Sequence, residues 1–162
     1  MRYGKILPIA EKYLEKIEPY CLRAVIAGSI RREKRDCNDI ELVIMIDQTK
    51  MQELVEIMDE FGGRVRGDIT GKATQRMTEE GLRLDIFIAA KDGTNWGNVL
   101  VIRTGSAAFS KWIMGFRAKE VGLRHQGGYL VKNEKKLICK EEMEVFRLLK
   151  LSWISPQDRS WK

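Results

Sequence analysis

Apolar residues recur with a helical period at two places in the first half of the chain. Near the N-terminus they are spaced by three and four with charged residues between them, which predicts an amphipathic helix over residues 4–18 that ends before Pro19. A similar pattern predicts a second helix over residues 50–61, stopped at Gly62-Gly63. The apolar face of this second helix contains Leu54, Ile57, Met58 and Phe61.

Short apolar runs predict five strands around these helices. The first run covers residues 22–27 and the second residues 39–46, whose nearly continuous apolar sequence predicts a sheet covered on at least one face. Glycines and turn residues delimit the other three strands, at residues 64–70, 72–77 and 82–89. This half of the chain therefore predicts a mixed sheet with flanking helices over residues 1–95.

The second half begins after a polar stretch, Lys91–Asn95. Beyond it we expect a helix at 96–103, a helix at 107–121 with Ser106 as its N-cap, a hairpin of residues 129–131 and 137–139, and a last helix at 140–149. The two later helices are predicted to bury Phe109, Trp112, Ile113 and Phe116, and Met143, Phe146 and Leu149, respectively. The predicted fold class is α+β: the mixed sheet with its helices, then a small α+β subdomain over residues 96–162.

The net charge of the chain indicates which class of partner it would bind. The 162 residues include 29 basic and 23 acidic side chains, for a net charge of +6, and an excess of positive charge favours polyanions, nucleic acid first. The longest apolar run, Leu42–Ile46, is too short for a membrane span, and the N-terminus lacks the pattern of a signal peptide. We therefore expect an intracellular protein that is not secreted. Cys21, Cys37 and Cys139 lack the spacing of a zinc site or a disulfide framework and are expected to be free thiols.

Acidic side chains gather on the predicted sheet beside a Gly-Ser corner. Asp39 and Glu41 are two positions apart on one strand, so their side chains share a face, and Asp85 shares a face with Arg83 on another strand. Hard cations such as Mg²⁺ prefer oxygen ligands of this kind. The Gly28-Ser29 corner offers backbone N–H groups and a hydroxyl, which suit a phosphate. Together these groups fit a two-metal phosphoryl-transfer site.

Other chemistries find less support in the sequence. A Walker-type phosphate loop and a dinucleotide fingerprint are absent. The only histidine, His125, has no serine or cysteine partner at a recognisable motif, which argues against a hydrolase triad. We expect His125 at the surface or at the seam between subdomains.

Several motifs, in this order, resemble a known family. Three segments resemble the nucleotidyltransferase superfamily that includes DNA polymerase β: Gly28–Arg32, Asp39–Glu41 and Leu84–Ile86. The second half resembles X-family DNA polymerases in Thr104-Gly105-Ser106 followed by Phe109, in residues 141–149 and in the ending Ile154–Arg159. The resemblance implies a catalytic palm over residues 1–95 and a nucleotide-selection subdomain over residues 96–162. Because the first predicted strand already begins at Leu22, it also implies a minimal form, similar to the small viral polymerases X, without the family's lyase and helix-hairpin-helix domains.

The resemblance also implies roles for individual residues. The catalytic and metal-binding carboxylates would be Asp39, Glu41 and Asp85, with Mg²⁺ as the cofactor and Mn²⁺ as the alternative. The residues that hold the incoming dNTP would be Gly28, Ser29, Arg32, Thr104, Gly105 and Ser106. Those at the DNA would be Arg83, at the primer end, and Lys111, at the template base.

The chain departs from the family pattern at several of its site positions. Glu41 stands where the family usually has an aspartate, and Ile102-Arg103 replace an aromatic pair that shapes the sugar site. Three residues that contact the template or the base in DNA polymerase β are replaced by Ala107, Ser110 and Met114. We therefore expect a polymerase of loose fidelity.

The function expected from the resemblance is a template-directed DNA polymerase. It would add dNTPs to a primer 3′-hydroxyl by two-metal phosphoryl transfer and fill short gaps in DNA repair, as a monomer acting on gapped or primer-template DNA. Two alternatives remain open at this stage. One is a template-independent nucleotidyltransferase acting on RNA ends or small molecules, and the other is a catalytically impaired DNA-binding module that keeps the fold.

Overall fold

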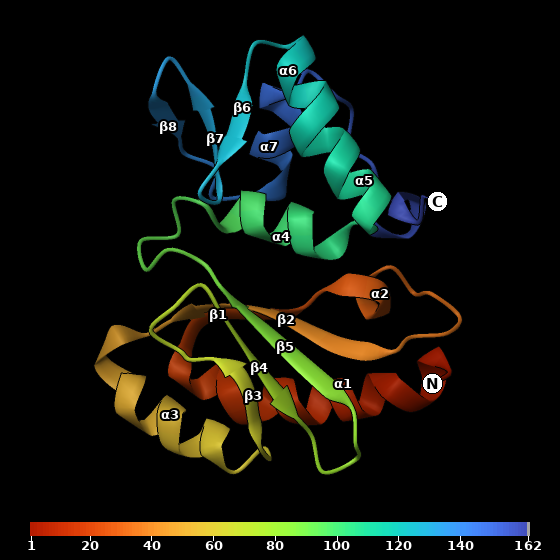
Figure 1. Ribbon diagram of the computed structural model, residues 1–162, viewed down its shortest axis with the longest axis vertical. Coiled ribbons are helices and arrows are strands. Elements are labelled where there is room, and N and C mark those ends of the chain that lie inside the picture. Colours follow the sequence, from red (N-terminus) through yellow and green to blue (C-terminus); the bar gives the residue numbers. More distant parts are fainter. Residues whose placement is uncertain (162) are drawn as a thin grey trace.

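A five-stranded mixed sheet forms the first half of the molecule, which we describe from a computed structural model covering residues 1–161 (Figure 1). The strand order is β1-β2-β5-β4-β3, and only the central pair, β2 and β5, is parallel. The strands are β1 (Cys21–Ile26), β2 (Asp39–Ile46), β3 (Arg64–Gly67), β4 (Ala73–Met77) and β5 (Arg83–Ile88). The predicted strands are all present and end within three residues of their predicted bounds.

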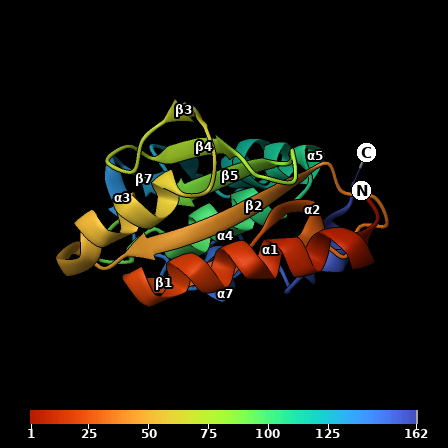
Figure 2. The same cartoon turned by 90° about the horizontal axis from the view of Figure 1, so that it is seen from below.

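Two helices cover one face of this sheet, α1 (Tyr3–Ile17) and α3 (Met51–Asp59), as Figure 2 shows from below. Their apolar faces pack against the inward side chains of β2 and β5, which include Leu42, Ile44 and Ile86. Because side chains alternate along a strand, the residues between these positions point to the opposite face. Three short helical segments lie in the connections: η1 (Glu18–Tyr20) between α1 and β1, α2 (Gly28–Arg31) between β1 and β2, and η2 (Gln48–Lys50) between β2 and α3.

The second half of the chain packs on that opposite face (Figure 1). Helix α4 (Trp96–Thr104) lies against it, where Trp96 and Leu100 pack with Val43 of β2. The rest builds its own core around Phe109 and Phe146. Its elements are α5 (Ala107–Lys111), η3 (Trp112–Arg117), α6 (Ala118–Glu120), β6 (Arg124–Gln126), β7 (Tyr129–Lys132), β8 (Lys135–Leu137), α7 (Glu142–Leu148) and η4 (Pro156–Arg159).

The predicted α+β fold class is confirmed, with corrections in the second half. The predicted hairpin is a three-stranded sheet, since β6 pairs with β7. The helix at 107–121 contains the π-helical segment η3, whose wider turns rotate the following side chains, so that Phe116 is 60% exposed and not inward as predicted. Met143 is also exposed, because α7 buries the stripe Glu142, Val145 and Phe146.

Candidate active site

The three predicted carboxylates lie on one face of the sheet, on its central parallel pair. Asp39 and Glu41 come from β2 and Asp85 from β5. The register pairs Glu41 directly with Asp85 and pairs Asp39 with Arg83. This is the face that carries α4, so the carboxylates point toward the C-terminal half of the chain and away from the apolar core under α1 and α3.

Arg83 lies between the two aspartates of this cluster. Its Nε donates a hydrogen bond to Asp85 Oδ2 at 3.0 Å, and its Nη2 is paired with Asp39. Gln75, on β4, donates a second hydrogen bond to Asp85 at 2.6 Å. The aspartates raise the pKa of Arg83, Asp85 with the larger effect. Arg83 thus orients both carboxylates.

Glu41 is half-buried within the cluster. Burial, together with the charges of Asp39 and Asp85, raises the pKa of its carboxyl to about 7, against the smaller opposing effect of Arg32 and Arg103. Gly28 makes room for this side chain: a Cβ at Gly28 would stand 1.7 Å from Glu41 Oε2, and the φ of Gly28 is +61°. The glycine of the Gly-Ser corner is therefore required by Glu41, whatever else it contacts.

The Gly-Ser corner also contains a polar atom without a partner. The hydroxyl oxygen of Ser29 is buried and has no hydrogen-bond partner among residues 1–161. Its neighbour Arg32 donates from Nη1 to the carbonyl of Thr104 at 2.6 Å and from Nε to the hydroxyl of Ser160. A buried hydroxyl that is left unpaired costs free energy, and a phosphate oxygen is a partner of the right chemistry.

A cleft of about 480 Å³ adjoins this corner and the carboxylates. Six of the predicted site residues line it, namely Ser29, Arg32, Asp39, Glu41, Gly105 and Ser106. We call this space the acidic cleft. Ser106 is also the N-cap of α5, as predicted, and accepts a hydrogen bond from the backbone N–H of Phe109.

The other predicted residues lie outside the acidic cleft. Thr104 is buried, and its oxygens accept hydrogen bonds from Arg31 and Arg32, so that it joins α4 to α2. Asp85 lines an adjoining space of about 390 Å³ together with Gln75. Lys111 is exposed at the end of α5 and lines none of the three clefts described here.

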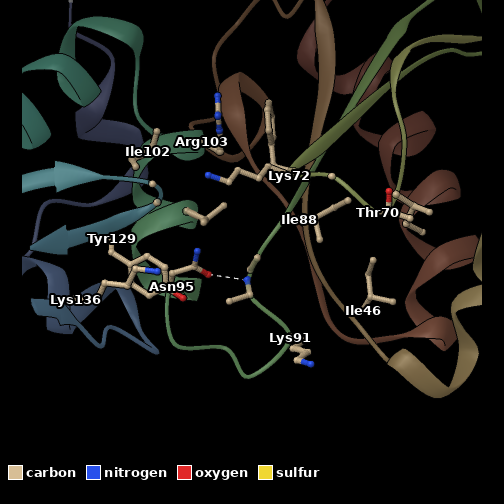
Figure 3. A pocket seen from close by; sticks show the side chains of 18 of the residues that line it. Ile46, Thr70, Lys72, Ile88, Lys91, Asn95, Ile102, Arg103, Tyr129 and Lys136 are labelled. Carbon is tan, nitrogen blue, oxygen red and sulfur yellow. Dashed lines mark hydrogen bonds between the residues drawn. The ribbon is translucent and has the colours of Figure 1, made fainter.

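A larger cleft of about 740 Å³ separates the sheet from the three-stranded unit (Figure 3). Its walls include apolar side chains and the rings of Phe87 and Tyr129, but no aspartate or glutamate among the described residues. Its five basic residues are Lys72, Lys91, Arg103, His125 and Lys136. We call it the basic cleft. His125 is at the seam, as predicted, and its pKa is lowered by partial desolvation of the ring in the cleft and by the charges of Arg103 and Lys72.

Arg103, like Gln75, is a site residue that the sequence analysis did not assign. It lines both the acidic and the basic cleft, and its guanidinium stacks on the ring of Phe87 at 3.9 Å. The sequence feature that could have identified Arg103 was the replacement of the family's aromatic pair by Ile102-Arg103.

The carboxylate oxygens of Asp39, Glu41 and Asp85 are ligands that suit a hard cation. The three side chains do not, however, converge on one position for an ion. Within residues 1–161, no group of three acidic, histidine or cysteine side chains is placed to hold a metal ion. Arg83 supplies the positive charge between Asp39 and Asp85, so a metal ion would have to displace it. The residues fit Mg²⁺ in chemistry, since oxygen donors with mutual repulsion favour a divalent cation.

Comparisons with known proteins bear on the second half of the chain. Residues 99–160 match the DNA polymerase beta thumb family. None of the curated proteins matches the chain, and none of the helices in residues 1–161 is long and apolar enough to cross a membrane. The thumb match begins within α4 and includes Arg103, Gly105 and Ser106, which line the acidic cleft together with Asp39 and Glu41. It supports a relationship of this chain to the X-family DNA polymerases.

Proposed function

We propose that the chain is a template-directed DNA polymerase that adds dNTPs to a primer 3′-hydroxyl and fills short gaps during DNA repair. One observation supports this most: the carboxylates and a buried, unpaired serine hydroxyl lie beside a cleft that is also lined by residues of the segment matching a polymerase thumb. This is the combination that a phosphoryl transfer to a nucleic-acid end needs, since it requires both charge and positioning.

The residues of the acidic cleft, and Asp85 in the adjoining space, have separable tasks in this proposal. Ser29 and Arg32 bind the triphosphate of the incoming nucleotide, and Gly105 and Ser106 lie along its sugar and base. Asp39, Glu41 and Asp85 are the residues that would hold Mg²⁺ or Mn²⁺, which when bound lowers the pKa of the attacking hydroxyl and neutralises the leaving pyrophosphate. Asp85 accepts the proton of the primer 3′-hydroxyl, and the hydrogen bond from Gln75 holds the carboxylate of Asp85 in position for this.

The basic cleft supplies the surface for the DNA. Its cations attract phosphates, while its apolar walls and two aromatic rings suit bases and sugars. Gapped or primer-template DNA and a dNTP are therefore the proposed partners of a monomeric protein, in a layout similar to the small viral polymerases X.

Primer extension tests this function. The protein is given open, one-nucleotide-gapped and recessed duplexes with each dNTP in turn, and we expect incorporation that follows the template base. Asp85→Asn should abolish incorporation and leave DNA binding intact, whereas the matched change Asp92→Asn, in the exposed loop after β5, should alter neither. Incorporation that ignores the template would contradict the proposal.

A second candidate is a template-independent nucleotidyltransferase acting on RNA ends or small molecules. Arg103 favours it, because a cation stands at the junction of the clefts where polymerases of the family carry an aromatic side chain. Extension of single-stranded RNA with NTPs, compared with duplex extension by dNTPs, separates the two.

A third candidate, a DNA-binding module without catalysis, is favoured by the position of Arg83 between the aspartates. Duplex binding without turnover in Mg²⁺ or Mn²⁺ would support it.

A further inference from the structure

Arg103 stands where the acidic cleft meets the basic cleft. It lies in the last turn of α4 and, with Ile102, lines both spaces. Figure 3 shows it entering the basic cleft from α4, in the region that Lys72 reaches from the sheet side. A substrate that extends from one cleft into the other must pass this side chain.

Two sets of contacts fix the position of Arg103. Its neighbour Thr104 accepts hydrogen bonds from Arg31 at 2.6 Å and from Arg32 at 2.6 Å, which ties the end of α4 to the sheet half of the molecule. The guanidinium itself stacks on Phe87, which follows Asp85 by two positions on β5 and so shares its face. The fork of Arg103 is therefore held beside the carboxylates without being bound to them.

The other arginines around the carboxylates are already engaged by the protein. Arg31 makes a two-point contact with Glu142, Arg32 donates to Thr104 and Ser160, and Arg83 binds both aspartates. Arg103 differs, because its charge interacts with Glu41 and Asp85 without a hydrogen bond to any of residues 1–161. All of its donors are available to a ligand, and a guanidinium fork matches the oxygens of a phosphate.

We propose that Arg103 is a substrate-binding residue whose guanidinium grips a phosphate of the substrate at the junction of the two clefts. This inference rests on the proposed function, which supplies two sources of that group. One is the triphosphate of the incoming nucleotide, and the other is a phosphodiester of the DNA strand in the basic cleft. Both are recognised by the same two-point contact, and the experiment distinguishes them.

The test measures binding without turnover. Affinities for a labelled dNTP in Mg²⁺, and separately for a one-nucleotide-gapped duplex, are compared between the wild-type protein and Arg103→Met, which keeps the apolar stem of the side chain. Because Arg103→Met loses a charge-assisted contact, its affinity for one of the two ligands should fall by about 10- to 100-fold. If that ligand is the DNA, the slope of log K against log salt should also fall by about 1. If it is the nucleotide, the DNA slope should stay unchanged.

Two further variants serve as controls for the Arg103→Met measurement. Arg147→Met removes the same charge from the exposed side of α7, where Arg147 lines neither cleft, and this variant should bind both ligands like the wild type. Arg103→Lys keeps the charge without the fork and should recover only part of the affinity. The inference would be overturned, and the proposed function left standing, if Arg103→Lys recovered the full affinity or if Arg103→Met bound both ligands like the wild type. A wild-type protein that binds neither ligand would overturn it together with the proposed function.

Discussion

Two glutamates in different halves of the molecule, Glu142 buried and Glu41 half-buried, have opposite electrostatic surroundings. Glu142, on α7, receives hydrogen bonds from Arg31 and Arg159, and these arginines lower the pKa of its carboxyl against the opposing effect of burial. Glu41, on β2, faces two aspartates, and burial and their charges together raise its pKa to about 7. Burial is common to both sites, so the neighbouring charges decide the outcome. Glu142, with arginines as partners, joins the two halves of the molecule. The carboxylate of Glu41, next to two other carboxylates, would be stabilised by a bound cation.

Removing the first glutamate should cause the largest loss of stability. Glu142→Ala leaves Arg159, which is fully buried, and Arg31 without their shared partner. Breaking a buried ion pair from one side typically costs about 3–5 kcal/mol, and we expect a loss of that size in the free energy of unfolding measured with urea. A loss below about 1 kcal/mol would show that this cluster resembles an exposed ion pair.

The second prediction concerns the space around Glu41. Gly28→Ala forces an alanine into a positive φ and against Glu41 Oε2. We expect a loss of about 1–3 kcal/mol in unfolding free energy. Adding Glu41→Ala to the same chain should recover the steric part, so the double variant should be less destabilised than the sum of the single variants. Strict additivity would mean that the two side chains do not compete for space.

The pH dependence of stability should have opposite signs at the two glutamates. The raised pKa of Glu41 contributes stability that is complete below the ordinary glutamate pKa of 4.5 and is lost as the pH rises toward about 7. The lowered pKa of Glu142 contributes stability that is present above 4.5 and is lost as the pH falls below that value. In thermal unfolding at several pH values, Glu41→Gln should flatten the decline between about pH 4.5 and 7. Glu142→Gln should flatten the decline in acid, and the reverse assignment would contradict the comparison.

The smallest effect is expected at Arg83. Its side chain is 49% exposed, and ion pairs in contact with solvent contribute about 0–1 kcal/mol. Arg83→Met should therefore change the unfolding free energy by less than about 1 kcal/mol. Removing this competing charge should, however, strengthen the binding of Mn²⁺ by the carboxylates, which titration of the Mn²⁺ spin-resonance signal can follow. Weaker Mn²⁺ binding would indicate that Arg83 positions the carboxylates more than it competes with the metal.

Periodicity predicted most of the fold because it reports burial directly. The alternation in residues 82–89 and the spacing of Asp39 and Glu41 placed three carboxylates on one face, and the pairing of β2 with β5 brought them together. The polar strand β6 was missed because Arg124, His125 and Gln126 are all exposed and give no apolar alternation.

The partners of individual charges could not be predicted in the same way. Arg31 is 111 positions from Glu142, and no local pattern indicates that this glutamate points inward. Met143 was therefore assigned the buried position that Glu142 occupies. The site shows the same limit: its carboxylates follow from spacing along two strands, but Arg83 between them and Arg103 at the junction depend on contacts across the sheet and between the halves.

The double hydrogen bond to Thr104 also limits how the molecule can move. Arg31 and Arg32 hold this one residue from adjacent positions of the chain. The ion pairs of Arg31 with Glu142 and of Arg23 with Glu141 join the two halves as well, so the C-terminal half is attached to the sheet half at several points. The β7–β8 turn lies on the side of the C-terminal half that faces away from the sheet (Figure 1). If the halves rotate relative to each other, this turn moves farther than residues at the interface, as the end of a lever does, and a probe at Glu134 in the turn would report the rotation.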